Sequence, residues 1–330
     1  MCGLLPHDVP GNRMSYRPGA LTASSEIGGR VPLASRRGPR DLGAAMRAFV
    51  RKHPVASFYA LVFTISWGGI LLVVRGAPGT SENVQRLMPM ALVAMFAGPS
   101  IAGLAMNALV SGRAGLRELL SRFTTWRMAA RWYAIALLTG PLLVSGVLFA
   151  LSLHSPAYLP GIVTAKDKAG LLLFGVAWAL TGGGLLEETG WTGFAVPTLR
   201  LRRGAVATGL IVGLMWGVWH FLIAFWASGS MSGGQSIAVF VTGFIVFYLA
   251  ALPAYRILMV KVYDRTRSLL NAMLMHASLS ASTLILQPTA TGMPYLVWNA
   301  VLAALLWLVV AIVSLPRGLR SGEHVVASGQ

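Results

Sequence analysis

Residues 170–196 read GLLLFGVAWALTGGGLLEETGWTGFAV, and this stretch decides the fold. It is apolar or small at nearly every position, and its only charged residues are Glu187 and Glu188. A helix needs roughly 20 such residues to cross a bilayer core about 30 Å thick. The sequence therefore predicts a transmembrane helix. The glycines around the acidic pair, followed by Pro197, predict a break or re-entrant bend near its end.

Other stretches of the chain are as apolar as this one. The segments predicted to span a bilayer are 55–74, 88–111, 132–153, 170–196, 204–226, 236–259, 269–287 and 294–315. Apolar residues make up 55% of the chain and charged residues only 11%, against about 25% charged in soluble domains. This composition excludes a soluble enzyme. The predicted fold is an all-α, polytopic membrane helix bundle with about eight transmembrane helices.

The basic residues are distributed unevenly between the predicted loops. Of the 27 Lys and Arg residues, all but Arg75, Arg86, Lys166 and Lys168 fall on the side of the two termini, and Arg256 is assigned there to the loop after the sixth segment. By the positive-inside rule both termini are cytosolic. The net charge of +17 thus reflects topology. We expect a multi-pass protein of the cell membrane with the lipid bilayer, and no nucleic acid, as its partner.

The two ends of the chain show no apolar periodicity. Residues 1–45 are rich in Gly, Pro, Ser and Arg and are predicted to be a disordered cytosolic arm, and residues 321–330 a disordered tail. Residues 46–320 form the helical domain between them. The single cysteine, Cys2, excludes an intrachain disulfide. The preference for Arg over Lys indicates a GC-rich, bacterial source.

Four ionisable residues lie within the predicted spans, clear of their ends. Glu187 and Glu188 are on the fourth segment, and His220 and His276 are on the fifth and seventh. Ionisable groups are costly inside a bilayer and usually functional. A lone buried His is more often structural, and an acidic pair at a helix end is usually a solvated cap. Two carboxylates and two imidazoles on three segments are nevertheless a set suited to activating a water.

Each of these residues has a companion four positions away on the same helical face. The pairs are Glu187–Trp191, Glu188–Thr192, Trp216–His220 and His276–Ser280. Adjacent helical residues point about 100° apart, so the two glutamates are expected not to aim at the same atom.

Three short motifs carry a resemblance to a known family. They are EETGWT (187–192), WGVWH (216–220) and HASLS (276–280), in this order on separate segments. Over about 170–285 the chain resembles the CPBP intramembrane proteases, which include the type II CAAX prenyl endopeptidases and the bacterial Abi group. The pattern of that family is E-E-x-x-x-R, F-x-x-x-H and H-x-x-x-N. The resemblance implies an intramembrane peptide hydrolase with eight spans and cytosolic termini.

The sequence departs from this pattern at three positions. Thr192 stands at the family's Arg, Trp216 at its Phe and Ser280 at its Asn. Trp216 keeps an aromatic wall and Ser280 keeps a hydroxyl donor, whereas Thr192 offers Glu188 no positive charge. Burial without such a partner favours the neutral form of a carboxyl group. We therefore expect Glu188 to be uncharged and to donate a hydrogen bond to Thr192.

The resemblance implies a role for each polar residue of the set. Glu187 acts as general base on a water that attacks the scissile carbonyl, and His220 positions that water. His276 and Ser280 donate to the developing oxyanion, and Glu188 orients the constellation. Two His and one Glu with an open position are also a catalytic zinc ligand set. A zinc ion on Glu187, His220 and His276 is thus the alternative to a metal-free water.

The sequence leaves the substrate open. Bacteria generally lack prenylated protein C-termini, so a membrane-associated peptide or protein is the expected substrate and partner. The alternative function is a non-enzymatic membrane scaffold or bacteriocin-immunity-type protein that binds a partner in the same cavity. A proton-coupled transporter is a third class, disfavoured because the sequence lacks paired broken helices in two halves.

Overall fold

The computed structural model describes residues 39–315, and within them the regular structure is entirely helical. Met1–Leu42 and Gly43–Gln330 are two separate units, and the arrangement below is that of the second. The longer helices are α1 (Pro39–Lys52), α2 (Pro54–Val74), α3 (Ser81–Phe123), α4 (Ala130–Ser152), α6 (Lys168–Trp178), α9 (Ala205–Trp219), α12 (Leu252–Thr266), α13 (Leu269–Leu286) and α14 (Gly292–Ser314). The shorter elements are η1 (Pro156–Tyr158), α5 (Gly161–Thr164), η2 (Ala179–Glu187), α7 (Glu188–Gly190), η3 (Trp191–Ala195), α8 (Val196–Arg200), α10 (Phe221–Ala227), η4 (Ser230–Ser232), α11 (Ile237–Phe244) and η5 (Ile245–Ala251).

Eight helical stretches are long and apolar enough to cross a membrane, which confirms the predicted all-α polytopic bundle. They are Pro54–Val74, Ser81–Phe123, Ala130–Ser152, Lys168–Arg200, Ala205–Ala227, Ile237–Thr266, Leu269–Leu286 and Gly292–Ser314. Each coincides with one predicted segment. Two of them, the second and the sixth, run on well beyond their predicted C-terminal ends.

The second span is longer than predicted because helical structure resumes after a kink. Gly112 has φ +61° and ψ −147°, a backbone conformation that glycine adopts readily and other residues rarely do. The segment after this kink carries Arg113, Arg117 and Arg122, which the sequence placed in a loop. The predicted end of the apolar run at residue 111 therefore marks the kink and not the end of the helix.

Helix α1 corrects the N-terminal boundary. Residues 39–45 were predicted to belong to a disordered arm, but a helix begins at Pro39. Proline suits a first helical turn because its fixed φ is already helical and its missing N–H has no partner there. The helix ends just before His53, and Pro54 opens α2. Residues 1–38 and the predicted tail 321–330 lie outside the described part of the chain.

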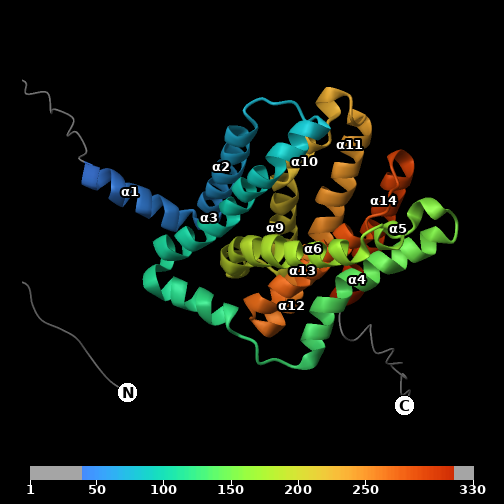
Figure 1. Ribbon diagram of the computed structural model, residues 1–330. Helices are drawn as coiled ribbons and strands as arrows, with labels where there is room; N and C mark the ends of the chain where they lie inside the picture. The colour runs from blue at the N-terminus through green and yellow to red at the C-terminus, as the bar shows by residue number, and fades with distance from the viewer. Residues whose placement is uncertain (1–38, 316–330) are drawn as a thin grey trace, which may run out of the picture. The chain divides into compact units, whose positions relative to one another are not determined.

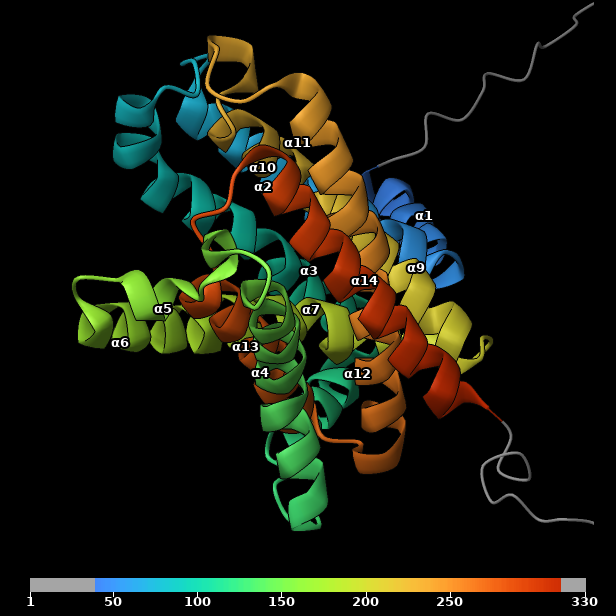
Figure 2. The same ribbon diagram turned by 90° about the vertical axis from the view of Figure 1, so that its right-hand side faces the viewer.

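Helix α13 is the most enclosed of the eight spans. Of its apolar window, 61% is buried inside the protein, against 39% or less in every other span. It packs along α4, against η2 and beside α12, and Figures 1 and 2 both show it running among these helices. A helix in this position can present polar groups to the interior without exposing them to lipid.

A stripe of glycines brings α9 close to the sixth span. A Cβ on Gly209 would lie 2.5 Å from the Cα of Ile257, and one on Gly213 would lie 2.4 Å from the Cα of Pro253. Small residues four positions apart allow two membrane helices to pack backbone to backbone. The close approach fixes the position of α12 relative to the end of α9.

The fourth span is continuous, not broken as predicted. Lys168–Arg200 contains two π-helical segments, η2 and η3, on either side of the short α7. Within the described residues a third π-helical segment, η5, interrupts the sixth span. Wider π turns are frequent at functional sites because they re-aim side chains without ending a helix. The glycine-rich stretch therefore changes the direction of Glu187 and Glu188 and leaves the span intact.

Candidate active site

Five of the residues singled out in the sequence line one cavity of about 470 Å³, namely Trp216 and four polar residues. Glu187 comes from the end of η2, and His220 from the junction of α9 and α10. His276 and Ser280 both come from α13. The fourth, fifth and seventh spans thus bring a carboxylate, two imidazoles and a hydroxyl to one space.

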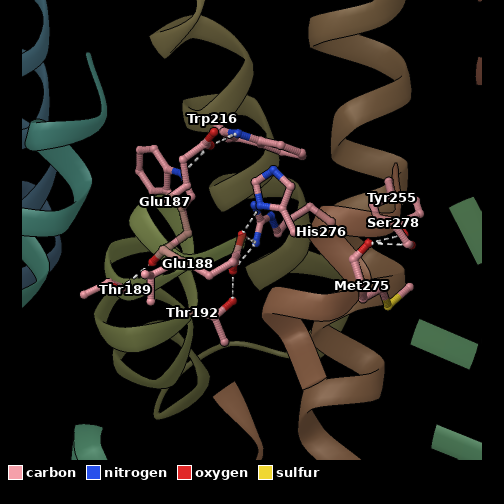
Figure 3. Close-up of polar contacts among 12 residues, drawn as sticks. Glu187, Glu188, Thr189, Thr192, Trp216, Tyr255, Met275, His276 and Ser278 are labelled. Carbon is pink, nitrogen blue, oxygen red and sulfur yellow. Dashed lines mark hydrogen bonds and ion pairs between the residues drawn. The ribbon is translucent and has the colours of Figure 1, made fainter. Parts of the chain in front are cut away.

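The carboxylate of Glu187 is held by two indole groups. Its Oε2 accepts hydrogen bonds from Trp191 Nε1 at 3.2 Å and from Trp216 Nε1 at 2.6 Å. Trp191 is the predicted companion one turn away, and Trp216 reaches across from α9, as Figure 3 shows. Within the described residues Oε1 accepts no hydrogen bond. One oxygen is thereby fixed, and the other is left for a group in the cavity.

Glu188 points away from Glu187, into the helix bundle, and does have a cationic partner. Arg256 of α12 places Nη1 at 2.8 Å from Oε1 and 2.9 Å from Oε2, and both side chains are completely buried. The expected neutral, unpaired Glu188 is therefore wrong. The expectation failed because Arg256 was assigned to a loop, whereas it lies inside α12. Thr192 donates to Oε2, the reverse of the expected direction.

His276 connects this ion pair to the cavity. Its Nδ1 lies 2.6 Å from Oε1 of Glu188, and the ring is buried. A Cβ on Gly183 would lie 2.8 Å from His276 Nε2 and 2.9 Å from Ser280 Oγ. The two polar atoms therefore lie on the same side of η2, and the missing side chain of Gly183 makes room for both.

His220 is fixed by its own helix. Its Nδ1 lies 2.8 Å from the carbonyl oxygen of Trp216. Because a carbonyl can only accept, Nδ1 carries the hydrogen, and Nε2 of the neutral ring is an acceptor. The ring packs edge-on to Trp219 and against Tyr248, with centroids 4.8 and 4.9 Å away.

Two residues of the site were missed by the sequence analysis. Tyr248 of η5 lines the cavity beside His220, and nothing in the sequence distinguishes it from the other aromatic residues of its span. Arg256 did carry a signal, because apolar residues fill the positions around it except at Lys261. Its assignment to a basic loop hid that signal.

The residues proposed as zinc ligands do not form a metal site. In the part of the chain that the structure describes, no three His, Cys, Asp or Glu side chains are placed to hold a metal ion. Nδ1 of each histidine is hydrogen-bonded, in His276 to Glu188 and in His220 to a backbone carbonyl, so only Nε2 of each ring is open to a ligand. No step of the chemistry below is assigned to a metal.

The arrangement defines a class of membrane protein. A polytopic helix bundle encloses an ionised cluster that opens into an apolar-walled cavity, and such a site can bind and polarise a water beside a hydrophobic ligand. Residues 168–282 match the family model described as type II CAAX prenyl endopeptidase Rce1-like. That segment holds all the predicted site residues and Arg256, and the match confirms the resemblance seen in the motifs. No curated protein matches the chain.

Proposed function

We propose that the protein is an intramembrane endopeptidase that hydrolyses a peptide bond of a membrane-associated peptide or protein. The observation that carries the proposal is the cavity shared by Glu187, His220, His276 and Ser280. Apolar side chains such as Met88 supply most of the remaining wall, which suits a hydrophobic peptide segment.

Glu187 is the proposed general base. Its Oε1 takes a proton from a water while the water oxygen attacks the scissile carbonyl carbon, and His220 Nε2 positions that water by accepting a hydrogen bond from its other O–H, whose hydrogen stays on the oxygen. The proton then passes to the leaving amine as the carbon–nitrogen bond breaks, so that Glu187 returns to its starting form. A positioned base contributes about 10²- to 10⁴-fold to such a rate.

His276 and Ser280 are the proposed oxyanion donors. For His276 Nε2 to donate, both ring nitrogens must carry hydrogen, and the Glu188 carboxylate beside Nδ1 stabilises that imidazolium. With both glutamates ionised, a protonated His276 and Arg256 make the cluster electrically neutral. Neutrality favours this assignment because an uncompensated charge is costly in a membrane interior.

We also propose that the protein resides in the plasma membrane of a bacterium with both termini in the cytosol. The uneven distribution of Lys and Arg along the sequence supports this orientation. Reporter fusions after Ala227 and Thr289 should then score as extracytosolic, and one after Arg203 as cytosolic. A cytosolic score at Ala227 would contradict the orientation of the fifth span.

The test of the endopeptidase uses the full-length protein in proteoliposomes with a library of membrane-associated peptides, analysed by mass spectrometry. We expect cleavage by the wild type and about a 10³-fold lower rate for Glu187→Gln. The amide of that variant still accepts from both indoles. Glu118→Gln is the matched control. The Glu118 side chain is 70% exposed on α3, so this variant should cleave at the rate of the wild type.

Two outcomes would contradict the proposal. Cleavage that persists unchanged in Glu187→Gln would remove the general base. Binding of peptides without cleavage by any variant would instead favour the scaffold or immunity-type function. That function is the second candidate because Thr192 and Ser280 replace the Arg and Asn of the family pattern.

A further inference from the structure

We infer that Arg256 of α12 is a positioning residue of the site. Its guanidinium holds Glu188, and through it His276, and it also holds Trp216, and through it Glu187. The inference rests on the proposed endopeptidase. It extends that proposal by assigning a function to a residue that none of the three motifs contains.

Burying Arg256 at this position has a high free-energy cost. Its side chain is completely buried in a membrane-spanning helix, where a guanidinium is tolerated only with a partner. Only Nη1 is hydrogen-bonded, and Nε and Nη2 find no partner within the described residues. An arginine retained only for stability would be expected to satisfy more of its donors. Its ion pair with Glu188 and its cation–π contact with Trp216 each connect it to a residue that lines the cavity, through His276 in the first case and directly in the second.

The first set of contacts runs through Glu188. Arg256 Nη1 touches both carboxylate oxygens, and the same carboxylate holds His276 Nδ1 at 2.6 Å. This fixes the rotation of the imidazole and directs Nε2 toward Ser280 and the cavity. A carboxylate that lost its cation would be free to turn, and His276 would turn with it.

The second set of contacts runs through Trp216. The guanidinium carbon lies 4.4 Å from the centre of the Trp216 ring, which is a cation–π distance. The indole N–H of the same ring donates to Glu187 at 2.6 Å. One cation therefore fixes the orienting glutamate through an ion pair and the base through an aromatic ring.

The close packing of α9 on α12 makes this reach possible. A Cβ on Gly213 would lie 3.1 Å from the Cβ of Arg256. The Arg256 side chain therefore leaves the α12 backbone next to the glycines of α9. In the pattern of the resembling family the cation follows Glu188 by one turn on the same helix. Here Thr192 occupies that position and donates only a hydrogen bond. The positive charge has moved from the fourth span to the sixth.

Exchanging the two side chains tests this relocation. The variants are Arg256→Met, the exchange variant Thr192→Arg/Arg256→Thr, and the control Arg265→Met near the exposed end of α12. We expect Arg256→Met to lower kcat by about 10²-fold with little change in KM, since it removes orientation and not substrate contacts. The kcat of the exchange variant should be at least about tenfold higher than that of Arg256→Met. Arg265→Met should have the kcat of the wild type.

A second measurement is independent of activity. Nitrogen-15 NMR of labelled histidine, assigned with His276→Gln, reports the state of His276 in every variant. We expect the His276 signal to change in Arg256→Met and to return in the exchange variant. If Arg256→Met fails to fold, Arg256→Lys keeps one positive charge but lacks the planar guanidinium that contacts both the carboxylate and the Trp216 ring, and in it the His276 signal should still change; an unchanged signal would overturn the inference.

The outcomes separate this inference from the proposed function. No cleavage by the wild type would contradict the endopeptidase, and the His276 signal would still test the role of Arg256. A folded Arg256→Met with normal kcat and an unchanged His276 signal would overturn the inference. An exchange variant that restores neither quantity would overturn it as well.

Discussion

Glu187 and Glu188 are neighbours in the chain, yet they belong to two chemically different regions. Glu187 faces the cavity and accepts only from two neutral indole N–H groups. Glu188 faces the interior, where Arg256, His276 and Thr192 surround it. Figure 3 shows the two side chains diverging toward Trp216 and toward His276. The difference teaches that two adjacent glutamates can have separate environments, Glu187 at the cavity wall and Glu188 in a buried ion pair.

The divergence follows from local geometry. Successive helical residues point about 100° apart, and the boundary between η2 and α7 falls between these two. The same helical segment therefore presents one carboxylate to the cavity and the next to a buried ion pair. Variants that affect the two regions differently test this comparison.

The largest expected effect is on stability. Glu188→Gln leaves the guanidinium of Arg256 buried without a counter-charge, which costs about 3–5 kcal/mol of unfolding free energy. Glu187→Gln should cost about 1 kcal/mol or less, because the amide oxygen still accepts from the indoles. Thermal unfolding of both variants in the same detergent gives the comparison. Equal losses would mean that the two regions do not differ as described.

Gly183→Ala should affect the cavity side alone. Its methyl group would lie within 3 Å of both His276 Nε2 and Ser280 Oγ, so it should displace the two proposed oxyanion donors and lower kcat by about 10²-fold. The matched control is Gly68→Ala, where a Cβ meets nothing within 4 Å. A Gly183→Ala variant with normal kcat would show that His276 and Ser280 are not donors.

Much of the bundle could be predicted from the sequence, because apolar runs and bilayer thickness determine where spans lie. The motifs also identified five residues of the cavity wall, since few ionisable residues occur inside the spans and the motifs link each to a companion one turn away. What failed was the pairing of Glu188. The partner of a buried charge is set by how α9 and α12 pack, through contacts such as Gly213 against Pro253. The apolar residues around Arg256 could have placed it inside a span, but no pattern within one segment says which carboxylate it meets.

Thr192→Arg alone distinguishes the two views of Glu188. From the sequence, a new arginine one turn after Glu188 would supply a missing partner and raise activity. In the structure it would place a second guanidinium beside Arg256 and overfill a buried position, costing about 1–3 kcal/mol. The unfolding free energy and the cleavage rate should both fall. A variant that is more active and as stable as the wild type would show that Arg256 does not satisfy Glu188.

The smallest expected effect concerns the hydroxyl of Thr192. Thr192→Val keeps the shape of the side chain and removes the hydrogen bond to Glu188, whereas Thr192→Ser keeps the donor. Because Arg256 and His276 still hold the carboxylate, the valine variant should lose only about 1 kcal/mol of unfolding free energy. Cleavage should fall less than tenfold, since the orientation of His276 depends on Arg256 first. The serine variant should lie closer to the wild type in both measurements. If Thr192→Val lost as much unfolding free energy as Glu188→Gln, the Thr192 hydroxyl would be the main partner of Glu188. Arg256 would then contribute little to holding that carboxylate.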